Sequence, residues 1–152
     1  MAYSADEARG QLLDDLAAAI DQLAFALACV GEAYDELDER AADVLEAEVF
    51  KPLQAAYGRA KRTHTEFARR YGLSERSFEE RSPGTHSGDP RVYLDRAVEA
   101  NEQGDHAIAE LQDSMMPVEV GDTELRAGLS ETRSQIAELP ARGRRLLRAL
   151  GR

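Results

Sequence analysis

The 152-residue sequence has little of what disulfide-linked, aromatic-rich or membrane-spanning proteins need. A single cysteine, Cys29, excludes an internal disulfide, and its place in the apolar run 27–30 predicts a buried, unreactive thiol. Tryptophan is absent and aromatic residues make up only 6% of the chain, which favours a helical protein over a β-sandwich. No run of 18 apolar residues occurs, so no transmembrane segment is expected.

Positive charge is also scarce, because the net charge is −10 and lysine occurs only at Lys51 and Lys61. This charge disfavours nonspecific binding to nucleic acid or to an anionic membrane surface. The first ten residues, MAYSADEARG, lack the basic and continuous apolar parts of a secretory or transit signal. We therefore expect a cytoplasmic protein.

The charge alternates in blocks along the chain. Residues 1–50 carry a net charge of −11, residues 51–82 carry +4, residues 83–140 carry −8 and residues 141–152 carry +5. An acidic helix can lie beside a basic one in an antiparallel bundle, so the simplest interpretation is pairing within the molecule.

Apolar residues recur with the helical period along nearly the whole chain, and no strand period is found. The first stripe alternates steps of four and three residues, as is typical of a packed bundle or coiled coil: Leu16, Ile20, Leu23, Leu27, Val30, Tyr34, Leu37, Ala41 and Val44. The sequence predicts a single all-α domain, an antiparallel up-down four-helix bundle with long, partly kinked helices. The helices are expected over residues 5–38, 43–71, 91–115 and 122–149, with a flexible loop over 74–90.

Caps and prolines set the expected breaks. Asp43 followed by Glu46 has the spacing of a capping box, which predicts a turn near residues 39–43; an unbroken helix to Phe50 is the alternative. Pro52 and Pro140 interrupt otherwise helical patterns and predict kinks.

Helical bundles often hold metals between carboxylates, so a metal- or small-ligand-binding bundle is a second possible function. Ferritin-like sites need inward Glu residues and Glu-x-x-His pairs, and all-α nucleotide pyrophosphohydrolases use Glu-x-x-Glu pairs for Mg²⁺. The side chains with related spacing are Glu32, Asp35, Glu36, Glu39, Glu99, Glu102, His106 and Glu110. Their helical positions place them on or toward outer faces, so no catalytic residue, metal ligand or cofactor is predicted. His64, at the edge of an apolar stripe, is expected to bond within the bundle.

The favoured function is therefore non-enzymatic and depends on protein–protein contacts or self-association, with a homodimer as the expected oligomer. The candidate contact residues form an acidic row and a basic tail: Glu32, Glu36, Glu39, Asp43, Arg142, Arg144, Arg145 and Arg148. The acidic row would dock a basic partner, for example the tail of a second copy, and Ala17, Ala18, Ala24 and Ala28 would permit close helix approach. The amphipathic tail leaves weak binding of nucleic acid or a membrane surface as a third possibility.

Overall fold

The computed structural model describes residues 4–151, and every regular element in that range is helical. The elements are α1 (Ala5–Glu36), α2 (Glu39–Leu45), η1 (Glu46–Phe50), α3 (Lys51–Arg70), α4 (Pro90–Asp113), α5 (Met116–Glu119), α6 (Thr123–Ile136) and α7 (Leu139–Leu150). The π-helical turn η1 joins α2 to α3 without a break. The all-α class predicted from the sequence is confirmed.

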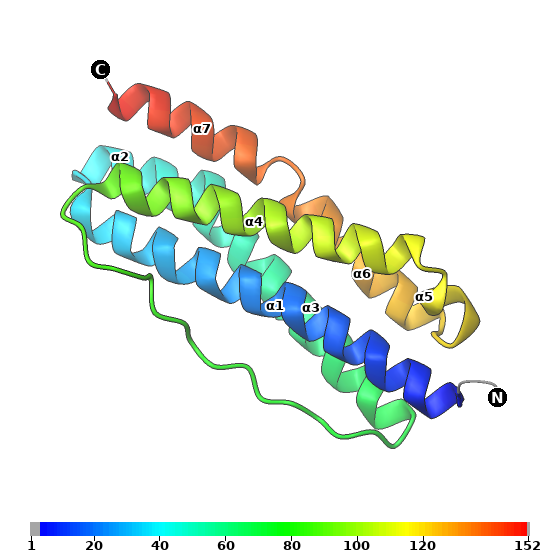
Figure 1. Cartoon of the computed structure of the whole chain (residues 1–152). Helices are drawn as coiled ribbons and strands as arrows, with labels where there is room; N and C mark the ends of the chain where they lie inside the picture. The colour runs from blue at the N-terminus through cyan, green and yellow to red at the C-terminus, as the bar shows by residue number, and fades with distance from the viewer. Residues whose placement is uncertain (1–3, 152) are drawn as a thin grey trace.

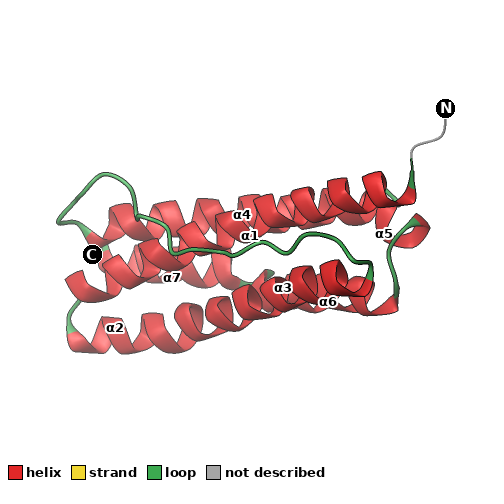
Figure 2. Cartoon of the chain, turned by 90° about the horizontal axis from the view of Figure 1, so that it is seen from below, coloured by secondary structure: helices red, strands yellow, loops and turns green. Residues whose placement is uncertain are grey.

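The longest helix, α1, packs mainly against α4 and also against α3, while α6 packs against α3 and α7 against α4. Figure 1 shows that α1 runs opposite to both α3 and α4, whereas α3 and α4 run in the same direction. The cause is the segment 71–89, which returns along the length of the molecule before α4 begins (Figures 1 and 2). The simple up-down order expected from the sequence therefore fails at this connection.

The first reversal of the chain lies at Leu37 and Asp38, ahead of the predicted turn at residues 39–43. Leu37 adopts extended backbone after the end of α1. The Asp38 carboxylate then accepts a hydrogen bond from the Ala41 N–H at 2.9 Å and caps α2. The capping box predicted at Asp43 is wrong, because Asp43 lies inside α2.

A backbone carbonyl group just before Pro52 is reached from α7. Proline has no N–H to donate to the carbonyl four residues earlier, which here belongs to Glu48. Arg142 Nη1 donates to this carbonyl at 3.1 Å. The π-helical turn directly before Pro52 also changes the local hydrogen-bond pattern, so the helix continues past the proline.

Pro140 creates the same problem between α6 and α7. The carbonyl four residues before it is that of Ile136, and the buried Asn101 side chain of α4 donates to it through Nδ2 at 3.1 Å. Here α6 and α7 do not form one continuous helix, because α6 ends at Ile136 and α7 begins at Leu139 after two intervening residues. A buried amide on a neighbouring helix thus replaces a backbone donor that the sequence lacks.

Glycines bring the helices close together. A Cβ atom on Gly104 of α4 would lie 2.9 Å from Leu23 Cδ2 of α1, and one on Gly128 of α6 would lie 2.1 Å from Thr63 Oγ1 of α3. Around these crossings lies a core of mainly Leu and Ala. Its two largest fully buried side chains are Tyr93 and Phe67. Small residues therefore set the spacing of the helix pairs.

Residues 71–89, called the strap from here on, follow the α1–α3 seam without regular structure (Figure 2). Arg76 and Arg81 both pair with Asp21 of α1 at 2.9 Å. The Phe78 ring packs edge-on against His64 of α3, with 5.1 Å between ring centroids. The middle of the strap is thus held by one carboxylate and one aromatic contact.

The end of the strap is held by α4. Arg96 Nη1 donates to the carbonyl groups of Pro83 and Thr85 at 2.9 and 2.8 Å. The Ser87 N–H donates to the Tyr93 hydroxyl at 2.7 Å. Among the described residues, no backbone–backbone hydrogen bond involves residues 74–88. The position of the strap therefore depends on side chains.

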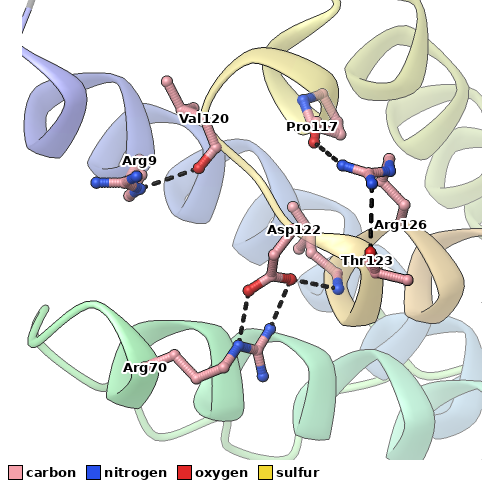
Figure 3. Close-up of polar contacts among 8 residues, drawn as sticks. Arg9, Arg70, Pro117, Val120, Asp122, Thr123 and Arg126 are labelled. Carbon is pink, nitrogen blue, oxygen red and sulfur yellow. Dashed lines mark hydrogen bonds and ion pairs between the residues drawn. The ribbon is translucent and has the colours of Figure 1, made fainter.

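Asp122 joins α3 to α6 at the end of the molecule opposite α2 (Figure 3). Its carboxylate accepts two hydrogen bonds from Arg70, at 2.7 and 2.9 Å, and one from the Leu125 N–H at 2.8 Å, which caps α6. Burial alone would raise the pKa of Asp122, but these hydrogen bonds lower it below its ordinary value. Arg9 of α1 donates to the Val120 carbonyl at 2.9 Å and ties α1 to the same corner.

Helix α1 is long and apolar enough to cross a membrane, judged by length and composition only. In this structure 56% of its most apolar 18-residue window is buried. The core helix of a bundle meets the same criterion, and the contacts with α3 and α4 account for the apolar character of α1.

Candidate functional site

Helix α2 separates two grooves of opposite character. Because successive residues are about 100° apart around a helix, Glu39 and Asp43 of α2 share one side with Glu46, the first residue of η1. Glu46 lines a groove between α1 and the η1–α3 rod, called the acidic groove below. Val44 points to the other side and lines a groove between α2 and α7, called the arginine groove below.

The acidic groove has a volume of about 860 Å³ and a floor of small residues. Ala24, Ala28 and Gly31 of α1 form this floor. Three aromatic side chains line the groove, namely Tyr34, Phe50 and Tyr57, and Pro83 of the strap is also part of its wall. The groove is open to solvent and combines apolar surface with room for side chains of a partner.

Carboxylates outnumber cations around the acidic groove. Its lining includes Glu32, Asp35, Glu46 and Glu80 against Lys61 and Arg81. Within residues 4–151 none of these four carboxylates takes part in an ion pair. Both cations are already engaged, because Lys61 Nζ lies 4.2 Å from the centre of the Tyr57 ring and Arg81 pairs with Asp21. The groove therefore has an excess of negative charge.

The protonation of Tyr57 reflects its surroundings. Burial, followed by the negative charges of Asp21 and Glu80, raises the pKa of the Tyr57 hydroxyl above its ordinary value, although Arg81 opposes this shift. Carboxylates on both α1 and the strap thus act on an aromatic side chain of the groove.

The arginine groove is smaller, at about 600 Å³, and carries the opposite charge on much of its rim. Arg40, Arg142 and Arg145 line it, together with Val44, which is 45% exposed. Asp38 and Glu48 also belong to the lining, and Leu146 and Leu150 of α7 contribute apolar surface. Arg142 pairs with Glu48, whereas no ion pair within residues 4–151 involves Arg40 or Arg145.

The structure separates the eight predicted contact residues into available and engaged ones. Exposed or groove-lining positions are occupied by Glu32, Glu36, Glu39, Asp43, Arg145 and Arg148. Arg142 is engaged with the carbonyl and carboxylate of Glu48, and Arg144 with the carboxylate of Glu102. Of the alanines expected to allow an extra helix contact, Ala17 is buried and Ala18 is exposed, while Ala24 and Ala28 line the acidic groove.

His64 and Cys29 lie beneath the strap. Burial lowers the pKa of His64, and its Nδ1 has no hydrogen-bond partner among the described residues. Burial raises the pKa of the Cys29 thiol to about 11, with a smaller opposing effect from Arg96, and Sγ lies 3.7 Å from the Pro83 carbonyl oxygen. A thiol with this pKa is a poor nucleophile at neutral pH.

The carboxylates considered as metal ligands do not converge in the described part of the chain. Within residues 4–151 no three His, Cys, Asp or Glu side chains lie close enough to share a metal ion. On the surface of α4, His106 pairs with Glu110 at 2.9 Å, and Glu102 contacts Arg144. His106, Glu110 and Glu102 are exposed on the outer side of α4, as their sequence spacing suggests.

The aromatic lining of the acidic groove was not predicted. Tyr34 belongs to the apolar stripe and was expected in the core, but it is 39% exposed. A strict alternation of four and three residues drifts around a straight helix, so its last members leave the buried face. Val44 is exposed for a different reason, because α2 starts as a separate helix after Asp38 and does not continue the register of α1.

The sequence matches no protein-family model, no curated protein and no solved structure. The functional argument therefore depends on the two grooves and their charges. These surfaces belong to neighbouring elements at one end of the molecule, where α2 lies between α1 and α7 (Figure 1).

Proposed function

We propose that this chain is a non-enzymatic bundle of four helical rods, with neighbouring rods antiparallel, that acts through protein contacts and associates with a second copy of itself. The observation that carries this proposal is the opposite charge of the two sides of α2. Its acidic side presents Glu39 and Asp43, and its other side borders the arginine groove with Arg145.

A two-fold axis parallel to α2 would pair opposite charges on both sides of this helix at once. Such a rotation sets the acidic side of one copy against the arginine side of the other, and the reverse contact forms by symmetry. A two-fold axis perpendicular to α2 would place like charges together. The charge distribution thus selects one orientation among the possible symmetric dimers.

The apolar surface for such a dimer comes from the same region. Val44 is one of the few large hydrophobic side chains that the structure leaves exposed, and Leu146 and Leu150 lie next to it in the arginine groove. Exposed ion pairs contribute only about 0.2–1 kcal/mol each, so they select the partner while buried apolar area supplies most of the affinity.

Charge reversal tests this proposal. Two double variants each place like charges across the proposed contact. One is Glu39→Arg with Asp43→Arg, and the other is Arg145→Glu with Arg148→Glu. We expect each to raise the dimer dissociation constant by about tenfold or more in sedimentation velocity experiments. A matched control reverses Glu99 and Glu119, which are exposed on α4 and α5 away from α2.

The proposal fails if the wild-type protein is monomeric at high micromolar concentration. It also fails if the control reversal weakens association as much as the reversals around α2, because net charge alone would then explain the effect. Raising the salt concentration should weaken the wild-type dimer, since salt screens exposed charges over about 8 Å at physiological ionic strength.

A further inference from the structure

The α1–α3 seam already binds one peptide segment, which is the strap of the same chain. The strap uses Arg76 and Arg81 against Asp21, and it places Phe78 against His64. Arg76 also lies over the Phe78 ring, with 4.9 Å between the guanidinium carbon and the ring centre. The chemistry of this contact is basic side chains on carboxylates, with an aromatic ring on the seam.

The acidic groove continues this seam toward α2 with the same kinds of groups. It offers Glu32, Asp35 and Glu46 as carboxylates outside ion pairs, and Phe50 and Tyr57 as aromatic surface. The strap reaches the groove through Glu80, Arg81 and Pro83 and then turns to α4, so most of the groove is left uncovered.

We propose that the acidic groove is a docking site for a basic amphipathic helix of a partner protein, bound along the seam between α1 and α3. This site goes beyond self-association, because the acidic groove is lined by α1, η1, α3 and the strap, whereas the proposed dimer contact is centred on α2 and α7. Apolar side chains of the partner would rest on the small residues Ala24, Ala28 and Gly31. Its lysine or arginine side chains would reach the surrounding carboxylates and aromatic rings.

Two features of the groove favour a cationic partner over an anionic one. The excess of carboxylates attracts positive charge and repels an acidic segment. The rings of Tyr57 and Tyr34 can receive cations on their faces, and Lys61 already occupies such a position on Tyr57. An amphipathic helix in a groove between two helices is a common mode of peptide recognition.

The test uses a fluorescein-labelled peptide of leucine and lysine with helical periodicity, about four turns long. It is titrated with the Arg145→Glu/Arg148→Glu protein, in which self-association is weakened and the acidic groove is unchanged. Anisotropy reports binding. A peptide with glutamate in place of every lysine serves as the ligand control. Peptide binding by this double variant can be measured whether or not the wild-type protein dimerises. The docking proposal and the dimer proposal can therefore fail independently.

Matched variants distinguish the groove from general attraction to an acidic protein. Glu32→Lys with Glu46→Lys should weaken peptide binding by about tenfold or more, whereas Glu99→Lys with Glu119→Lys, which changes the net charge equally, should change it by about twofold or less. Glu32→Gln with Glu46→Gln provides a second groove variant if the lysine variant does not fold, and we expect a smaller loss. Absence of binding, or equal losses in the groove and control variants, would overturn the proposal.

Discussion

Replacing Gly128 by alanine should destabilise the protein, although alanine is the better helix former. Gly128 lies in α6 where it crosses α3, and a Cβ atom there would lie 2.1 Å from Thr63 Oγ1 and 2.7 Å from Thr63 Cγ2. Thr63 has little freedom to move, because its hydroxyl donates to the Arg59 carbonyl at 2.8 Å and accepts from Arg59 Nη1 at 3.0 Å. The two helices would have to separate.

The expected net effect follows from two opposing contributions. Overpacking of a core crossing costs about 1–3 kcal/mol, and the change from glycine to alanine inside a helix gains about 1 kcal/mol. We therefore expect Gly128→Ala to lower the free energy of unfolding by up to about 2 kcal/mol. Urea unfolding followed by far-UV circular dichroism measures this change.

Two further variants check the reasoning behind Gly128→Ala. Gly10→Ala is the matched control, because a Cβ atom on Gly10 meets nothing within 4 Å, and it should stabilise the helix by about 0.5–1 kcal/mol. In a Thr63→Ala background the cost of Gly128→Ala should shrink, since only the Cβ atom of residue 63 remains near the new methyl group. If Gly128→Ala stabilises the protein as Gly10→Ala does, the close crossing of α3 and α6 is wrong.

Four other variants probe the features that position the site. Asn101→Leu should lower the free energy of unfolding by about 1–3 kcal/mol in urea titrations. The reason is that the Ile136 carbonyl, to which Pro140 cannot donate, loses its hydrogen bond from Asn101 Nδ2. Wild-type stability should fall as the pH drops from about 6.5, because burial keeps His64 neutral in the folded state while the unfolded chain takes up a proton; His64→Gln should flatten this dependence in the same assay. Met115→Gly should raise the unfolding temperature, since Met115 has a φ of 69° that glycine adopts without strain. Arg96→Gln removes two hydrogen bonds to the strap and should speed tryptic cleavage within residues 71–89, measured by mass spectrometry; an unchanged rate would contradict the anchoring role.

The helical class could be predicted from the sequence because the apolar period is long and uninterrupted by strand patterns. The first helix was expected to end at residue 38 and ends at Glu36. The break itself was misplaced, because Asp38 and Asp43 are both suitable N-cap residues and local sequence does not decide between them. The order of the helices was harder still. Whether a connection of 19 residues forms a compact turn or a crossover depends on contacts such as Arg81 with Asp21, far apart in the sequence.

The acidic row was predicted as one side of a continuous helical pattern. The chain reverses at Leu37 and Asp38, so Glu32 lies on α1 whereas Glu39 and Asp43 lie on α2. The use of Arg142 inside the molecule could not be foreseen, because it depends on the carbonyl and carboxylate groups of Glu48, which is 94 residues away in the sequence. Tyr34 was expected in the core because it continues the apolar repeat, but this repeat drifts around a straight helix and its last members leave the buried face.

The most direct test of self-association through α2 mixes the two charge-reversed proteins. Each protein alone, Glu39→Arg/Asp43→Arg or Arg145→Glu/Arg148→Glu, places like charges at both contacts of the symmetric dimer. In a one-to-one mixture, opposite charges meet at both contacts, so native mass spectrometry should show a heterodimer while each protein alone remains mainly monomeric. A mixture that stays monomeric while the wild-type protein dimerises, or homodimers of the separate variants, would contradict the proposed contact.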